Sequence, residues 1–168
     1  VRDLPVARLG GWEGRSLQAG DLVPLGPPSD ARGEPVSRPP WRGEARVVLG
    51  PELSRFGPDA TETLLSEPFT VSATGNRVGM RLHGPTLEVR DSGEGLSSPM
   101  VRGAIQVPVA GEPIVLGPDH PTLGGYPVIA VVIRADQGDL AARRPGDVVR
   151  FRAVSVEEAR ALWQPVLL

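Results

Sequence analysis

The sequence predicts a mainly β protein, a barrel or a sandwich, with a few short helices. About eight short segments either alternate apolar and polar residues or run continuously apolar, as strands do. Turn signals separate them about every eight to twelve residues, and Gly and Pro supply 21 and 19 of the 168 residues. A chain of this length forms one domain, or one domain with an appendage, and the spacing does not indicate βαβ units.

The first 45 residues read as a partial upstream segment and a linker, and residues 46–168 as the barrel domain. Glycine and proline fill residues 1–45 without a period of 2 or 3.6. Within that part, residues 22–25 predict a short strand, and residues 26–43 predict a linker or extended arm. The chain opens with Val1 rather than Met, which favours a segment cut from a longer protein.

A helix and four strands are expected between residues 46 and 90. The helix spans residues 59–66, because Pro58 precedes it and Pro68 ends it. Gly84 and Pro85 indicate a turn, so the strands on either side of them form a hairpin or meander. The four strands span residues 46–49, 69–72, 78–82 and 86–90.

The second half of the chain predicts further strands and two helices. Residues 105–107 and 113–116 form a pair of strands across residues 110–112. The continuous apolar run 128–133 predicts a fully buried strand at the centre of the core. The remaining elements are a helix at 136–143, a strand at 148–154 in which Val and Phe alternate with Arg, and an amphipathic helix at 156–163.

The composition excludes several kinds of chemistry. All 18 basic residues are Arg, Cys is absent, and the two His residues are His83 and His120. The chain therefore supplies no thiol nucleophile, Schiff-base lysine, P-loop lysine or biotin-bearing lysine. Two His without Cys do not make a structural zinc site, so no metal is assigned, although Mg²⁺ bound by carboxylates alone stays open.

Net charge and hydropathy indicate which classes of binding partner to exclude. A net charge of −2 and a pI near 5.7 give no electrostatic footprint for nucleic acid. No apolar run is long enough to span a bilayer, and no signal peptide is recognisable. We therefore expect a cytoplasmic protein that binds neither nucleic acid nor membrane.

Polar blocks between the strands suggest a cleft for an anion. Asn76 and Arg77 are catalytic candidates, because an amide donates and accepts hydrogen bonds and a guanidinium grips carboxylate or phosphate. The alternative is a turn-forming Asn beside a solvated Arg. Arg81 shares a strand face with Gly79 and would line it with Arg77, unless it is simply solvated. Gln106 projects opposite to its apolar neighbours, into a cleft or onto the wet face of the sheet.

A second block combines a base, a hydroxyl and paired glycines suited to an oxyanion. Tight-turn geometry is the alternative, and a lone His before Pro is often only a loop residue. An aromatic side chain before Pro127 would cap or close the pocket, and His83 is interpreted as structural. The candidates are Asn76, Arg77 and His120 for catalysis, and Arg81, Gln106, Asp119, Thr122, Gly124, Gly125 and Tyr126 for substrate binding.

Four blocks resemble the C-terminal half of the family formed by the C subunit of 5-oxoprolinase, also called allophanate hydrolase subunit 2 or biotin-dependent carboxyltransferase-domain proteins. The family patterns are Gly-Gly-x-x-Gly-Arg-x-Leu-x-x-Gly-Asp, Ser-x-Asn-Arg-Met-Gly-x-Arg-Leu-x-Gly, Gly-x-Ile-Gln-Val-Pro-x-x-Gly-x-Pro-Ile and Thr-Gly-Gly-Tyr-Pro. They stand here, in the same order, at residues 10–21, 73–84, 103–114 and 123–127. Two departures are Ser97-Ser98-Pro99, where the family often has Ser-Glu-Gly, and Leu123 in place of Thr.

The resemblance, which covers roughly residues 9–151, implies a cyclophilin-like β-barrel after about residue 45. It implies part of an ATP-dependent complex that opens the lactam 5-oxoproline to glutamate together with companion subunits, with ATP bound here or with a partner. Family members run to about twice this length, so we expect a fragment or a truncated gene product.

Two other functions stay open. One is a carboxyltransferase domain that moves carboxylate from carboxybiotin to urea or a similar amide, with the biotin supplied by a partner. The other is a non-catalytic regulatory docking module, which the absence of the family's Glu favours.

Overall fold

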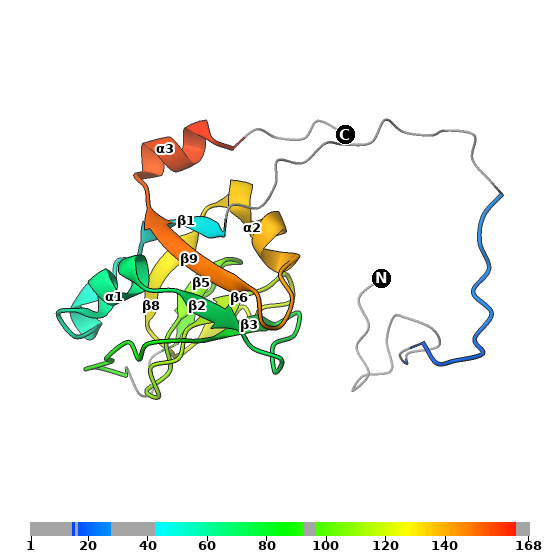
Figure 1. The fold of residues 1–168 in the computed structure, drawn as a ribbon, viewed down its shortest axis with the longest axis horizontal. Coiled ribbons are helices and arrows are strands. Elements are labelled where there is room, and N and C mark those ends of the chain that lie inside the picture. Colours follow the sequence, from blue (N-terminus) through cyan, green and yellow to red (C-terminus); the bar gives the residue numbers. More distant parts are fainter. Residues whose placement is uncertain (1–14, 16, 28–42, 93–96, 164–168) are drawn as a thin grey trace. The chain divides into compact units, whose positions relative to one another are not determined.

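The computed structural model describes residues 15, 17–27, 43–92 and 97–163, and it confirms a mainly β fold built as a barrel (Figure 1). The chain divides into two compact units, Val1–Arg38 and Pro39–Leu168, and the barrel belongs to the second unit. Seven strands close the barrel in the order β1-β8-β5-β6-β3-β2-β9. They span Glu44–Leu49 (β1), Phe69–Val71 (β2), Gly79–His83 (β3), Ala104–Gln106 (β5), Ile114–Leu116 (β6), Val128–Val132 (β8) and Val148–Ala153 (β9).

Alternating side chains explain how these short strands close on themselves. In β9, Val149 and Phe151 are buried, while Arg150 and Arg152 between and beyond them are exposed. The same period of 2 runs through β1, which pairs with β9 in parallel and with β8 antiparallel. All other barrel pairs are antiparallel, and the single parallel pair closes the barrel.

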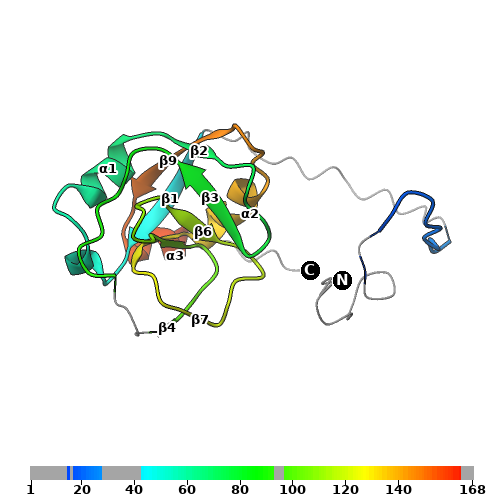
Figure 2. The same ribbon diagram turned by 90° about the horizontal axis from the view of Figure 1, so that it is seen from below.

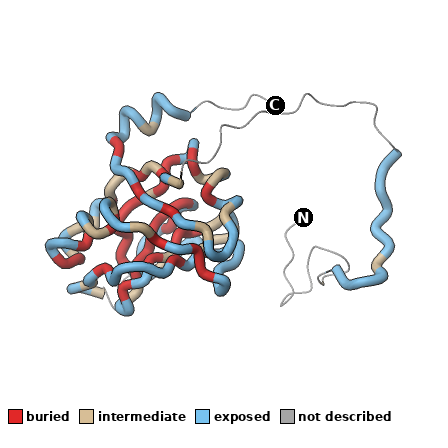
Figure 3. Tube along the Cα trace, in the orientation of Figure 1, coloured by how far each residue is buried: buried red, intermediate tan, exposed pale blue. Residues whose placement is uncertain are grey.

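The barrel interior forms the main core. The strand predicted to be fully buried is β8, and four of its five residues are buried, while Val131 is partly buried. Phe69 and Phe151 meet with ring centroids 6.0 Å apart, a separation that favours tilted aromatic packing. Figure 3 shows the buried segments gathered inside the barrel. The largest fully buried side chains are Phe69, Phe151, Leu64, Leu82, Leu87, Ile105 and Ile129.

Within the described residues, three short α-helices accompany the barrel. The first, α1 (Ala60–Ser66), buries Leu64, and the second, α2 (Arg134–Ala141), buries Asp136 and Leu140. The third, α3 (Val156–Ala161), begins with a capping box between Ser155 and Glu158. No residue of α3 is buried, so the helix predicted to be amphipathic buries no side chain in the core. Just beyond it, the guanidinium of Arg134 lies 5.0 Å from the centre of the Trp163 ring.

A two-stranded ribbon covers part of the barrel's outer face. It pairs β4 (Ser98–Pro99) with β7 (Leu123–Gly124), which lie together in Figure 2. Beneath it lies a second, smaller apolar cluster made by Met100, Ala104, Leu116 and Val128. The outward faces of β5, β6 and β8 are therefore shielded from solvent by this cluster, and these strands have buried apolar side chains on both sides.

Two predicted strands were wrong. Residues 86–90 form no strand, because β3 already pairs with β2 and β6 and leaves no free edge for a hairpin partner. Instead, Leu87 enters the core, its N–H donates to the carbonyl of Gly111 at 3.0 Å, and Val89 makes an isolated bridge with Phe56. Residues 22–25 form no strand either, and Leu22 and Leu25 are 88% and 89% exposed.

The other predicted elements lie within one or two residues of those observed. A short 3-10 helix, η1 (Leu53–Arg55), and the two strands of the ribbon, β4 and β7, were not expected. Within the described ranges, no helix has both the length and the apolar character needed to cross a bilayer.

Candidate functional site

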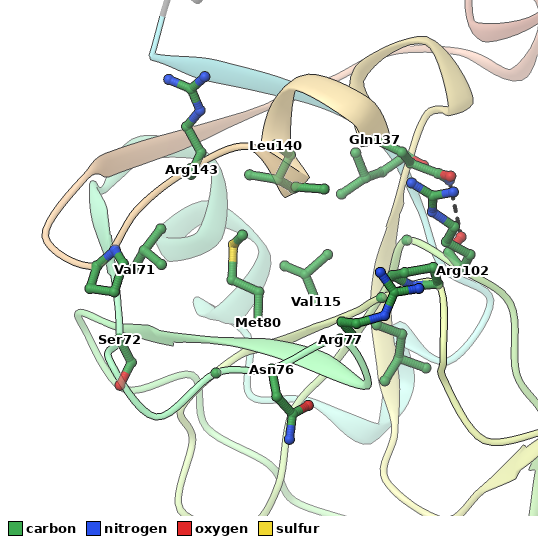
Figure 4. A pocket seen from close by; sticks show the side chains of 18 of the residues that line it. Val71, Ser72, Asn76, Arg77, Met80, Arg102, Val115, Gln137, Leu140 and Arg143 are labelled. Atoms are coloured by element: carbon green, nitrogen blue, oxygen red, sulfur yellow. Dashed lines mark hydrogen bonds between the residues drawn. The ribbon is translucent and has the colours of Figure 1, made fainter. Parts of the chain in front are cut away.

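A cavity of about 370 Å³ opens at the end of the barrel where β3 and β5 begin and β6 and β8 end (Figure 4). Helix α2 forms its wall on one side. The residues that line it come from the ends of β2 and β8, the turn before β3, the approach to β5 and the loop after β6. They include Val71, Ser72, Asn76, Arg77, Met80, Arg102, Gly103, Val115, Leu116, Gly117, Val132, Gln137, Leu140 and Arg143.

The floor of this pocket is apolar. Val71, Val115 and Leu140 belong to the main core cluster, and Met80 packs against it (Figure 4). Ligand pockets of this size combine such surfaces with a few polar groups that fix orientation. The polar groups here decide which molecules fit.

Arg77 stands at the mouth of the pocket in a turn that Asn76 shapes. The Asn76 side-chain oxygen Oδ1 accepts from the N–H groups of Val78 at 2.8 Å and Gly79 at 3.3 Å, which is an Asx turn. Nε of Arg77 donates to Oδ2 of Asp119 at 2.9 Å, and this bond raises the pKa of Arg77 above its usual value. The Arg77 side chain is 71% exposed, so it stays charged and accessible.

Close backbone packing fixes the position of Arg77. Its carbonyl accepts from the N–H of Asp119 at 3.1 Å, and the neighbouring carbonyl of Val78 accepts from the N–H of Gly117 at 2.9 Å. A Cβ on Gly117 would lie 2.2 Å from the Arg77 carbonyl oxygen. Gly117 therefore lets the loop after β6 approach the Arg77 turn.

Arg102 is the second cation of the pocket, on the same side of the cavity as Arg77 and Gln137 (Figure 4). Its carbonyl accepts from Nε2 of Gln137 at 3.0 Å, and that nitrogen also donates to the carbonyl of Val132 at 3.1 Å. The next residue, Gly103, has φ +87°, a conformation that side chains disfavour. The Arg102 guanidinium makes no hydrogen bond or ion pair with any residue the structure describes.

The charge of the pocket is one-sided. Three Arg residues line it, and among the described residues the lining contains no Asp or Glu. Asp119 compensates Arg77 from just outside, and Arg143 donates through Nε to the carbonyl of Asp139 at 3.0 Å. Arg143 points away from the cavity in Figure 4. Within the described ranges no three His, Asp or Glu side chains gather as a metal site would require.

The predicted catalytic residues occupy different places. Asn76 and Arg77 line the pocket, although the Asn76 amide points away from its interior (Figure 4). His120 does not line it: its Nδ1 lies 2.8 Å from the carbonyl oxygen of Pro121, in the loop after β6. Arg81 is exposed on β3 outside the pocket lining, so it does not share a binding face with Arg77.

The other predicted binding residues gather at the β4–β7 ribbon, except Asp119, which holds Arg77. Gln106 is 5% exposed, so it does not lie on a solvent-exposed face of the sheet, and it does not line this pocket. Its Nε2 donates to the carbonyl of Tyr126 at 3.1 Å. A Cβ on Gly124 would lie 2.7 Å from that nitrogen. The Thr122 carbonyl accepts from the N–H of Met100 at 2.9 Å. Gly125 and Tyr126 are exposed, and the Tyr126 ring closes no part of this pocket.

Arg102 and Gln137 were missed from the sequence. Arg102 directly precedes the 103–114 block, so its position beside a glycine-led strand was a signal. Gln137 lies in an eight-residue helix with no distinctive pattern, and only the tertiary contact with Arg102 identifies it.

The fold and the pocket define a β-barrel domain with a cationic, small-molecule-sized site, and residues 4–153 match the family described as "Carboxyltransferase domain, subdomain A and B". The chain belongs to this family.

Several individual proteins and one solved structure are similar to this chain. The chain is 40% identical to the C subunit of 5-oxoprolinase from Haemophilus influenzae over 157 residues, 93% of this chain and 51% of that protein. It is 30% identical to urea amidolyase of Lachancea kluyveri over 184 residues, 94% of this chain and 10% of that protein. The crystal structure of TTHA0988 matches with a TM-score of 0.65 at 39% identity, covering 83% of this chain and 28% of that one. The chain thus spans about half the length of the 5-oxoprolinase component that it matches.

Proposed function

We propose that this chain is the C-terminal part of the C subunit of a 5-oxoprolinase and works, with companion subunits, in the ATP-dependent opening of 5-oxoproline to glutamate. The observation that carries the proposal is 40% identity to a 5-oxoprolinase component along 93% of the chain. The urea amidolyase from Lachancea kluyveri shares 30%. The higher identity favours the lactam over urea as the substrate.

The pocket fits the charge of this reaction. Ring opening adds water across the lactam C–N bond: the water oxygen bonds to the carbonyl carbon, the nitrogen gains a proton, and ATP hydrolysis drives the step. The substrate carries a carboxylate, and activation of the amide develops further negative charge on oxygen. The guanidinium of Arg77 at the mouth offers directed donors to such groups.

The chain contributes positioning and electrostatic stabilisation rather than a covalent nucleophile. Cys and Lys are absent from the sequence. Among the described residues, the Ser72 hydroxyl at the pocket bonds only to the N–H and the hydroxyl of Thr74, at 3.2 and 3.0 Å, and not to a base. ATP contact and the remaining catalytic groups are assigned to the complex as a whole, with partner subunits sharing the chemistry.

The test is ATP hydrolysis and glutamate formation by the complex that contains this chain, measured with and without 5-oxoproline. Arg77→Gln should lower the oxoproline-dependent rate about 10-fold or more, since removing one directed donor to developing charge has effects of this order. Arg160→Gln on α3, outside the pocket lining, is the matched control. An intact complex that releases no phosphate in response to 5-oxoproline would rule out this function.

Carboxyl transfer is the second candidate, because the family itself is described as a carboxyltransferase domain. In that case a partner supplies carboxybiotin, and the pocket holds urea or a similar amide. The same complex would then consume ATP in response to urea and bicarbonate, and would lose that activity when avidin sequesters the biotin. A response to 5-oxoproline that avidin does not affect would exclude it.

A further inference from the structure

The neighbourhood of Arg102 has the features of a prepared anion site. Its carbonyl is held by Gln137 at 3.0 Å, and the N–H of the next residue, Gly103, donates to the carbonyl of Leu116 at 2.8 Å. The Gly103 carbonyl in turn accepts from the N–H of Val132 at 2.8 Å. The backbone is therefore fixed on both sides of the Arg102 side chain, which is exposed at the pocket.

Gly103 and Gln137 are matched to each other. A Cβ at position 103 would stand 2.6 Å from Nε2 of Gln137 and 2.9 Å from the carbonyl oxygen of Val132. Any side chain there would displace the amide that holds Arg102, and φ +87° would strain it as well. The local geometry thus depends on glycine at this position.

Arg77 and Arg102, the two cations at this side of the pocket, differ in whether a carboxylate neutralises their charge. Nε and one terminal nitrogen of Arg77 already face Asp119, at 2.9 and 3.4 Å, so that pair is close to neutral. Arg102 has no such counter-charge among the described residues, and the lining holds no carboxylate. Arg102 therefore carries the local excess of positive charge.

We propose that Arg102 is the primary carboxylate receptor of the pocket, with Arg77 as the second donor and Gln137 as the residue that positions Arg102. The ligand class is a small carboxylic acid whose body lies on the apolar floor formed by Met80, Val115 and Leu140. The inference rests on the proposed function for its choice of acid, 5-oxoproline. It adds that Arg102 distinguishes this acid from its neutral amide.

The test compares 5-oxoproline with 5-oxoprolinamide, in which a neutral carboxamide replaces the carboxylate. In the intact complex, Arg102→Gln should raise KM for the acid about 10- to 100-fold, the range for a lost charge-assisted hydrogen bond, and change KM for the amide less than about 3-fold. Arg160→Gln should change neither. Equal weakening of acid and amide by Arg102→Gln would overturn the proposal, because it would show a structural effect only.

Gln137 is tested through the same discrimination. Gln137→Met keeps the length of the side chain and removes both donated hydrogen bonds. It should reduce the preference for acid over amide, and the two lost bonds should lower the melting temperature by several degrees. A lower melting temperature with the preference intact would assign Gln137 to stability alone.

Direct binding separates this proposal from the proposed function. The Nε–H NMR signal of Arg102 in the full chain should shift on addition of 5-oxoproline and not of the amide. A shift with inorganic phosphate but not with 5-oxoproline would overturn the carboxylate assignment. Turnover of 5-oxoproline without any dependence on Arg102 would refute this inference and leave the proposed function standing. Binding of 5-oxoproline at Arg102 without turnover by the intact complex would refute the proposed function and leave this inference standing.

Discussion

The attachment of α2 to the barrel depends on one buried carboxylate. Asp136 is 7% exposed, and it accepts from the backbone N–H of Arg46 at 2.7 Å and from Nε of Arg46 at 2.9 Å. Its other oxygen pairs with a terminal nitrogen of the same guanidinium at 2.5 Å. The bond raises the pKa of Arg46 above its usual value, so the arginine stays charged. These contacts join β1 to the helix that carries Gln137 and Leu140 into the pocket wall.

Asp136→Ala should destabilise the fold by about 3 kcal/mol. Removing one member of a buried ion pair costs about 3–5 kcal/mol, because the other charge is left without a partner. The low end applies here, since a quarter of the Arg46 side chain reaches solvent (25% exposed). For a domain of this size, about 3 kcal/mol corresponds to a fall in melting temperature of about 12 °C.

Asp139→Ala is the matched control on the same helix. It removes the same charge one turn later, where the side chain makes no hydrogen bond with the described residues. It should shift the melting temperature by less than about 2 °C. Arg46→Met supplies a second comparison, because it leaves the backbone N–H bonded to Asp136 and should cost about 1 kcal/mol less than Asp136→Ala. Circular dichroism melts and urea titrations measure all three. If Asp136→Ala is no more destabilising than Asp139→Ala, the account of α2 is wrong.

Three further predictions use other parts of the chain. Gly117→Ala should cost about 1–3 kcal/mol by crowding the Arg77 carbonyl, measured by urea unfolding; unchanged stability would contradict the 2.2 Å approach. Gly138→Ala, whose Cβ meets nothing within 4 Å in the middle of α2, should instead stabilise by about 0.5–1 kcal/mol in the same assay. Arg15 holds the pKa of Asp21 down to about 2 from its ordinary 3.8. This contact therefore stabilises the folded form above about pH 4 and is lost as pH falls through about 2. A carboxyl NMR titration should give that value, and Arg15→Gln should raise it.

Local patterns predicted the barrel well where one strand face is buried. The alternation in residues 148–154 reports directly on which side chains point inward, and β9 has that pattern. The hairpin at Gly84 and Pro85 failed for a reason that local sequence does not contain. Residues 86–90 have apolar alternation, but the edge they would need is taken by β6, which arrives from more than 20 residues later.

The site was predicted only in part. A glycine in a sequence block can make room for a packed neighbour or shape a binding site, and the sequence alone does not distinguish the two. The block at 10–21 contains a bidentate contact between Arg15 and Asp21, at 2.8 Å for each bond, around the left-handed Gly20. The glycine at position 124 leaves room for the Gln106 amide. Both features have an explanation in the chain's own packing.

The pocket differs in this respect. Gly103 and Gly117 also make room for neighbours, but the neighbours they admit hold Arg102 and Arg77 at the mouth of a cavity. The Arg102 guanidinium reaches solvent and bonds to no residue that the structure describes. Fixing its position therefore contributes nothing to packing. A fixed backbone beneath a free charge is what selective binding of an anion requires, since it lowers the ordering cost of binding. The place in the pocket lining is what separates Arg102 from Arg81, which is also exposed on a fixed strand but lies outside that lining. The acid-against-amide comparison is therefore the decisive measurement of what the pocket recognises.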